Sequence, residues 1–191
     1  METYIHKAAT LLEALPYIQR FRDEIFVVKY GGSFMDSKDP AVRESVARDI
    51  VFLEAVGINP VVVHGGGKAI SRAMESEGIQ PNFVHGFRQT DAESVAVVER
   101  TLSQQINPGI VETIQRLGGN AVGFSGTEVL GCEKFCARDP DGESVDIGYV
   151  GRVERVDTQR LLAQIDNHVT PVVSPTALGL DGHIYNCNAD V

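Results

Sequence analysis

The sequence predicts an α/β fold with a mainly parallel central sheet, because one pattern occurs twice in its first half. Residues 25–30 (IFVVKY) and residues 60–64 (PVVVH) are short runs rich in β-branched residues, and each run ends in glycines. Such runs are typical of buried strands that open into a tight turn. A stretch with helical spacing follows each run, and consecutive strand–helix units predict parallel strands joined by right-handed crossovers.

Helices are predicted where apolar residues recur at spacings of three and four. The predicted stretches are residues 5–21, about sixteen residues from Pro40, 68–77, 91–105, 108–117 and 158–166. The first of them carries Leu11, Leu15 and Ile18 on one stripe. An apolar stripe of this kind has to be buried against another surface.

Capping signals divide residues 91–117 into two helices. Thr90 or Asp91 is expected to cap the first helix, since short polar side chains accept hydrogen bonds from free N–H groups. Asn107 followed by Pro108 is expected to open the second helix, because proline is well tolerated in a first turn.

Further strands are predicted in the second half of the chain. Residues 121–124 and 170–174 (TPVVS) are short apolar runs, and residues 183–185 follow an Asp-Gly turn. Between them, residues 130–156 alternate apolar and polar side chains among glycines and aspartates. This alternation favours β-hairpins over helices.

Length and charge limit the class of protein. At 191 residues and 43% hydrophobic, the chain is long enough for one domain with a sizeable core. Its net charge of -9 argues against binding to nucleic acid, which needs clustered Lys and Arg. No apolar run reaches the roughly eighteen residues that a membrane span needs. We therefore expect a soluble protein without nucleic-acid or membrane partners.

The cysteines argue against a disulfide framework and against a metal site. Cys132, Cys136 and Cys187 are few, scattered and odd in number. No His or further Cys stands near the first two to complete a tetrahedral zinc site, so no metal site is predicted. This usage favours a reducing compartment, and we expect a cytoplasmic location.

The glycine turns at residues 31–32 and 65–67 would lie at the carboxyl ends of parallel strands, where open α/β sheets bind ligands. Glycine lets the backbone approach an anion, and the helix start that follows adds N–H donors, so a phosphate or carboxylate site is predicted. A Walker A alignment fails at Val62 and Ala69, and a dinucleotide fingerprint fails at Ile70. The alternative is that these glycines serve only the turn geometry.

Two cations near these turns are candidate substrate ligands. Lys29 interrupts an apolar strand, where a charge is costly unless it faces a ligand or reaches solvent from an edge strand. Facing a ligand, it could act as a point charge on a transferring phosphoryl group. The planar fork of Arg88 could clamp a carboxylate, or it could pair with Asp91 or Glu93 at the surface.

A polar row ends the sequence. Asn186, Asn188 and Asp190 alternate after a strand, so an extended backbone would present all three side chains on one face. Such a row could bind a ligand, or it could shape a turn.

Six stretches, taken in order, resemble the amino-acid kinase family and, within it, the acetylglutamate kinases. They are VVKYGG, VVVHGGGKAIS, GFRQTD, AVGFSG, PVVSP and NCNAD. The leading segment KAATLLEALPYIQRF is similar to the extra amino-terminal helix of the ring-forming, arginine-regulated branch. The resemblance spans essentially the whole chain. It implies a three-layer α/β/α sandwich with a mainly parallel central sheet.

The resemblance also implies an activity and partners. The expected reaction is phosphoryl transfer from ATP with Mg²⁺ to the γ-carboxylate of N-acetyl-L-glutamate, a step of arginine biosynthesis. Residues 1–22 would be an oligomerisation helix, and residues 23–191 would be the acetylglutamate-binding domain. The expected assembly is a homo-oligomer, either a dimer or a hexameric ring formed through the amino-terminal helix, with arginine as an effector of the full enzyme.

The resemblance assigns roles residue by residue. Lys29 would stabilise the charge on the γ-phosphoryl group, and Asp190 would orient lysines rather than take a proton. The backbone donors to the phosphoryl group would be Gly31, Gly32 and Gly65. The residues that bind acetylglutamate would be Gly66, Gly67, Arg88, Asn186 and Asn188, with Arg88 and Asn186 on its α-carboxylate.

Departures from the family pattern leave alternatives. GTEVLG stands where a Lys-Asp-Gly run is usual, Gln89 replaces an apolar residue, and Pro108 follows Asn107 in place of Lys. Family members continue for roughly another hundred residues, the scale of a further domain, which hold most of the ATP site. The isolated chain is therefore expected to be inactive. The alternatives are a non-catalytic acyl-amino-acid-binding or assembly module and an amino-acid kinase of another substrate.

Overall fold

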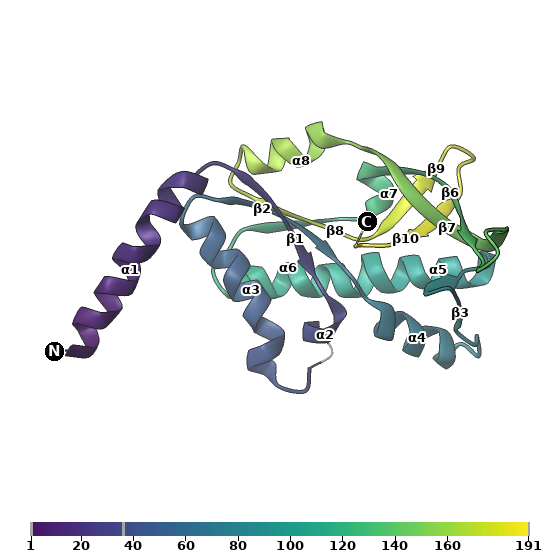
Figure 1. Ribbon diagram of the computed structural model, residues 1–191, viewed down its shortest axis with the longest axis horizontal. Helices are drawn as coiled ribbons and strands as arrows, with labels where there is room; N and C mark the ends of the chain where they lie inside the picture. Colours follow the sequence, from purple (N-terminus) through teal and green to yellow (C-terminus); the bar gives the residue numbers. More distant parts are fainter. Residues whose placement is uncertain (1, 36, 191) are drawn as a thin grey trace.

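A parallel sheet forms the centre of the molecule (Figure 1). The computed structural model describes residues 2–35 and 37–190. The sheet has four strands in the order β1 (Ile25–Tyr30), β2 (Asn59–His64), β8 (Thr170–Val173) and β5 (Ala121–Phe124). Every neighbouring pair is parallel. The predicted α/β fold with a mainly parallel sheet is confirmed.

The described residues form nine helical segments, and helices among them pack against both faces of this sheet. They are α1 (Glu2–Phe21), α2 (Gly32–Met35), α3 (Pro40–Ala55), α4 (Gly67–Ser76), α5 (Ala92–Thr101), the π-helix η1 (Leu102–Ile106), α6 (Asn107–Arg116), α7 (Gly126–Val129) and α8 (Thr158–Ile165). On one face, Ile50 of α3 and Ile114 of α6 pack against Val62 and Val172 of the strands. On the other face, Leu161 of α8 packs against strand residues. These three layers follow from the apolar stripes, which each need a covered surface.

The two helices predicted between residues 91 and 117 form one helical run, so that boundary prediction is wrong (Figure 1). Asp91 caps the start as predicted, because its carboxylate accepts from the Ser94 amide. Asn107 has helical dihedral angles and caps nothing, since the π-turn before it carries the helix past Pro108. Its amide donates instead to the carbonyl of Val172, 2.9 Å away in the sheet.

A second body of strands lies beside the carboxyl ends of the sheet. It is a closed barrel of β10 (Ile184–Cys187), β7 (Ser144–Val156), β6 (Leu130–Arg138) and β9 (Thr176–Gly179), next to a hairpin of β3 (Asn82–Val84) and β4 (Phe87–Gln89). The hairpin predicted at residues 130–156 is confirmed as β6 and β7. The sequence analysis missed β9, because its four residues carry no strand pattern and pair only with distant segments.

Strand β1 lies at the edge of the sheet, so the prediction that it is buried is wrong. Val27 is 72% exposed, and only Tyr30 of this strand is buried. An apolar run does not reveal how many neighbours a strand has.

Helix α1 projects from the rest of the molecule (Figure 1). Leu11, Leu12 and Leu15 are exposed on it, so their apolar stripe is not covered by this chain. Among the described residues, no helix combines the length and apolar character needed to cross a membrane.

Candidate functional site

A cleft of about 380 Å³ lies where β1 and β2 end and meet the barrel and the β3–β4 hairpin. Among the described residues, Gly31 is the only predicted site residue that does not line it. The lining residues already singled out from the sequence are Lys29, Gly32, Gly65, Gly66, Gly67, Arg88, Asn186, Asn188 and Asp190. The carboxyl ends of parallel strands therefore meet here with β10 and the hairpin.

The ammonium group of Lys29 forms an ion pair with the carboxylate of Asp190. Both side chains are about half exposed, so the pair contributes little to stability, of the order of 0–1 kcal/mol. The chain turns at residues 189–190, and the Asn188 side chain accepts from the Asp190 amide at 3.1 Å. The strand ends at Cys187, so the backbone does not stay extended, and Asn188 shapes a turn, which was the alternative interpretation of this row. All three polar residues, Asn186, Asn188 and Asp190, still line the cleft.

The two glycine turns touch each other. The Gly65 amide donates to the carbonyl of Tyr30 at 2.9 Å, and a Cβ on Gly65 would lie 3.8 Å from the Gly32 nitrogen. A Cβ on Gly66 would lie 2.6 Å from the Ile106 side chain and 2.8 Å from that of Leu102. A methyl group at position 66 would therefore force the side chains of Ile106 and Leu102 to shift.

The helix start after the second turn is open toward ligands. Helix α4 is ten residues long and has no side-chain cap at Gly66. Its first N–H groups lack intrahelical partners and carry the positive end of the helix dipole. This arrangement suits a carboxylate or a phosphoryl group.

Arg88 does not lie at the surface with Asp91 or Glu93, so that alternative is wrong. It is 7% exposed, and one of its nitrogens, Nη2, donates to the carbonyl of Gly67 at 2.8 Å and to the Ser71 hydroxyl at 2.9 Å. Its guanidinium lies 4.7 Å from the centre of the Phe83 ring. Burial lowers the pKa of Arg88, but an arginine remains charged at neutral pH.

The sequence analysis missed the apolar wall of the cleft. Ile70, Phe83, Leu102, Val150 and Pro175 supply it from five separate segments. Apolar residues in helices and strands are usually core residues, so no local signal marked them. Together with the cations and free amides, this wall suits a small molecule that carries both carboxylates and an apolar group.

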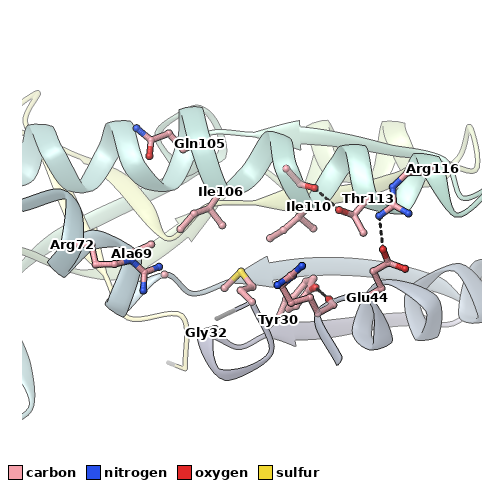
Figure 2. A pocket seen from close by; sticks show the side chains of 14 residues that line it. Tyr30, Gly32, Glu44, Ala69, Arg72, Gln105, Ile106, Ile110, Thr113 and Arg116 are labelled. Atoms are coloured by element: carbon pink, nitrogen blue, oxygen red, sulfur yellow. Dashed lines mark hydrogen bonds and ion pairs between the residues drawn. The ribbon is translucent and has the colours of Figure 1, made fainter. Parts of the chain in front are cut away.

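A second hollow of about 390 Å³ lies behind the glycine turns, between α3, α4 and α6 (Figure 2). Figure 2 shows Ile106 and Ile110 pointing from the helical run toward Tyr30, while Arg116 pairs with Glu44 at 2.8 Å. It shares only Gly32 and Gly66 with the predicted site, so the cleft remains the better candidate. Within residues 2–35 and 37–190, no cluster of three or more His, Cys, Asp or Glu could hold a metal ion.

Comparisons with known proteins identify the family of the chain. The model of the amino acid kinase family matches residues 24–191. The chain is 46% identical to the acetylglutamate kinase of Akkermansia muciniphila over 188 residues and 48% identical to that of Rhizorhabdus wittichii over 191 residues. These alignments cover 98% and 96% of the chain, and the chain spans 63% of the length of each relative.

A solved structure shows the same fold. It is the N-acetylglutamate synthase of Neisseria gonorrhoeae, complexed with coenzyme A and N-acetyl-glutamate. The TM-score is 0.78 at 23% identity, over 95% of this chain and 40% of that one. With the family model matched over residues 24–191 and relatives at 46% and 48% identity, the chain belongs to the amino acid kinase family.

Proposed function

We propose that this chain is the acetylglutamate-binding part of an acetylglutamate kinase, which phosphorylates the γ-carboxylate of N-acetyl-L-glutamate with ATP in arginine biosynthesis. The observation that carries the proposal is the cleft, where Lys29, the glycine turns, Arg88 and Asn186 lie together. The relatives named acetylglutamate kinase support the choice of substrate.

In this proposal the cleft works by positioning and by charge. Phosphoryl transfer depends mainly on alignment and on stabilising the charge of the transferred group. Lys29 supplies that charge, and Gly31 and Gly32 supply backbone donors. Gly65 was expected to be a third donor, but its amide already donates to the Tyr30 carbonyl, because the two glycine turns are joined there. An ionised carboxylate needs no general base, so Asp190 holds Lys29 in place through their ion pair.

The acceptor would be held at its other end. Arg88 and Asn186 bind the α-carboxylate, Gly66, Gly67 and Asn188 lie along the molecule, and the apolar wall receives the acetyl group. Arg88 is fixed by the bonds of Nη2 to Gly67 and Ser71 and by the contact of Nη1 with the Met74 sulfur at 3.4 Å. An anchored α-carboxylate leaves the γ-carboxylate free for in-line attack.

Nucleotide binding and oligomerisation are proposed for the whole protein. Mg²⁺ would enter with the ATP phosphates, because Asp190 is the only carboxylate among the described residues that line the cleft, and it is paired with Lys29. The exposed stripe of α1 is where a homo-oligomer, a dimer or a ring, would form. We propose a cytoplasmic enzyme with arginine as its effector.

An acceptor panel tests the function. The full-length protein, expressed from its natural start codon to its natural stop codon, is assayed for ADP release with N-acetylglutamate, glutamate, aspartate, carbamate and a nucleoside monophosphate. Turnover is expected with N-acetylglutamate far above the others. Equal turnover with unacetylated glutamate would reject the proposed substrate, and binding of N-acetylglutamate without any turnover would favour a non-catalytic binding module.

A further inference from the structure

His64 has no role in the function proposed above, although it is the last residue before the second glycine turn. It is fully buried at the end of β2. Val62, two residues earlier, packs into the layer of α3 and α6, and alternation along the strand places His64 on the same face. Burial lowers the pKa of His64 to about 4, so the ring is neutral at neutral pH.

The neighbours of His64 determine which ring nitrogen carries the proton. The Asn107 amide nitrogen lies 2.9 Å from the carbonyl oxygen of Val172, so it must be the donor in that contact. The same nitrogen lies 3.3 Å from Nε2 of His64 and 3.4 Å from the carbonyl oxygen of Phe124. An amide nitrogen donates and does not accept, so Nε2 is the acceptor in its contact with Asn107. In a neutral imidazole the other nitrogen then carries the hydrogen. Nδ1 lies 3.0 Å from the carbonyl oxygen of Gly65 and donates to it.

This hydrogen bond fixes the peptide between Gly65 and Gly66. The described residues contain no cis peptide, so the C=O and the following N–H point in opposite directions. The Gly65 carbonyl turns toward His64, on the α6 side of the sheet. The Gly66 N–H therefore points away from His64, and Gly66 lines the cleft together with Lys29 and Asn186.

Other contacts hold the same peptide. The Gly65 amide is bound by the Tyr30 carbonyl at 2.9 Å, and Gly66 lies against Leu102 and Ile106 of the π-turn. Within the described part of the chain, the Gly66 amide donates to no protein acceptor. It is a fixed donor at the cleft with its hydrogen available to a ligand.

We propose that His64 is a positioning residue: through Nδ1 and the Gly65 carbonyl it aims the Gly66 amide at a carboxylate of the bound substrate, and Asn107 selects the required tautomer. The inference deepens the proposed function and rests on it for the identity of the ligand. His64 itself does not touch the substrate.

Two substitutions separate positioning from simple packing. His64→Asn places an amide nitrogen near the position of Nδ1, so a donor to Gly65 remains. His64→Gln places its amide near the position of Nε2, facing Asn107, and leaves the Gly65 carbonyl without that donor. Both remove the aromatic ring and both introduce a neutral amide.

Steady-state kinetics of the full-length protein provide the readout. A lost charge-assisted hydrogen bond raises a dissociation constant by about tenfold or more, so His64→Gln should raise the KM for N-acetylglutamate by that factor while the KM for ATP stays within about twofold. His64→Asn should keep the KM for N-acetylglutamate within about threefold of the parent value. Equal effects of the two variants, including no effect, would overturn the proposal.

Nitrogen NMR of the histidine rings in the unaltered protein gives a second, independent test. The expected result is a protonated Nδ1 and an unprotonated Nε2 in His64. The opposite tautomer would overturn the inference even if both variants fail to fold. A parent protein without turnover on N-acetylglutamate would reject the proposed function, whereas the tautomer would still decide whether His64 orients the turn.

Discussion

The two glycine turns of the cleft come from one sequence pattern but differ in structure. Tyr30 and His64 are paired in register at the ends of β1 and β2, and two glycines follow Tyr30 while three follow His64. Tyr30 donates its hydroxyl to the carbonyl of Arg43 on α3. His64 bonds instead to its own turn and to Asn107.

Their surroundings differ as well. The first turn follows an edge strand and leads into a helix of four residues. The second follows a buried strand, leads into a helix of ten residues and packs against the π-turn. The comparison teaches that strand β1, just before the first turn, places the charge of Lys29 at the cleft, whereas the packing of the second turn gives it a fixed shape.

The largest expected effect comes from removing the charge of Lys29, which lies just before the first turn. Lys29→Ala in the full-length protein should lower kcat for phosphorylation of N-acetylglutamate by about 10²–10³-fold, the usual loss when one preorganised donor to developing charge is removed. The KM for N-acetylglutamate should change little. Stability should stay within about 1 kcal/mol, because the Lys29–Asp190 pair is exposed.

Lys68→Ala is the matched control, because this exposed lysine follows the second glycine turn and does not line the cleft. It should leave kcat unchanged. An equal fall in kcat in both variants, or a rise in KM without a fall in kcat, would contradict the assignment of the catalytic charge to Lys29.

The next largest expected effect is the pH dependence of stability, which should involve His64 and not Tyr30. The pKa of His64 is about 4 in the folded protein, against an ordinary value of 6.5. Between pH 4 and pH 6.5 the unfolded state binds more protons at this position than the folded state does. The free energy of unfolding should therefore be unaffected by His64 above pH 6.5 and should fall by about 3 kcal/mol as the pH drops to 4. Tyr30 is silent in this window, since burial raises its pKa above 10.

Urea unfolding of the parent and of His64→Asn at pH 7 and pH 4 isolates this effect from carboxylates that titrate in the same range. The parent should lose about 3 kcal/mol more than the variant. If the free energy of unfolding falls equally in the two proteins, protonation of His64 does not destabilise the folded state.

Local patterns predicted much of this molecule, and the failures have a common cause. The motifs around Lys29 and Gly65 indicated a site because strand ends converge at one edge of a parallel sheet. The sequence did not show that β1 is an edge strand, because the composition of an apolar run does not indicate how many strands pair with it. Asn107 looked like a helix cap, but its partners His64, Val172 and Phe124 are 43, 65 and 17 residues away. Such distant pairings leave no local signature.

Substitutions of the glycines test the shape of the second turn. Gly66→Ala should cost about 1–3 kcal/mol in the free energy of unfolding, because the new methyl would overlap Ile106 and Leu102. Gly65→Ala is the control, since its methyl would meet only ordinary contacts with Gly32 and Tyr30. A smaller loss for Gly66→Ala than for Gly65→Ala, measured by urea unfolding, would refute the claim that the π-turn fixes this loop.

The smallest effect should come from Tyr30→Phe, which removes the hydroxyl that joins the first turn to α3. This single neutral hydrogen bond is worth about 0.5–1.5 kcal/mol, so the unfolding midpoint should fall slightly while kcat and both KM values stay the same. The Tyr30 hydroxyl donates to a neighbouring helix rather than to its own turn, so it does not orient Gly31 or Gly32. A change in KM that matched that of His64→Gln would mean that both strand ends orient their turns, and the contrast between charge and shape would then fail.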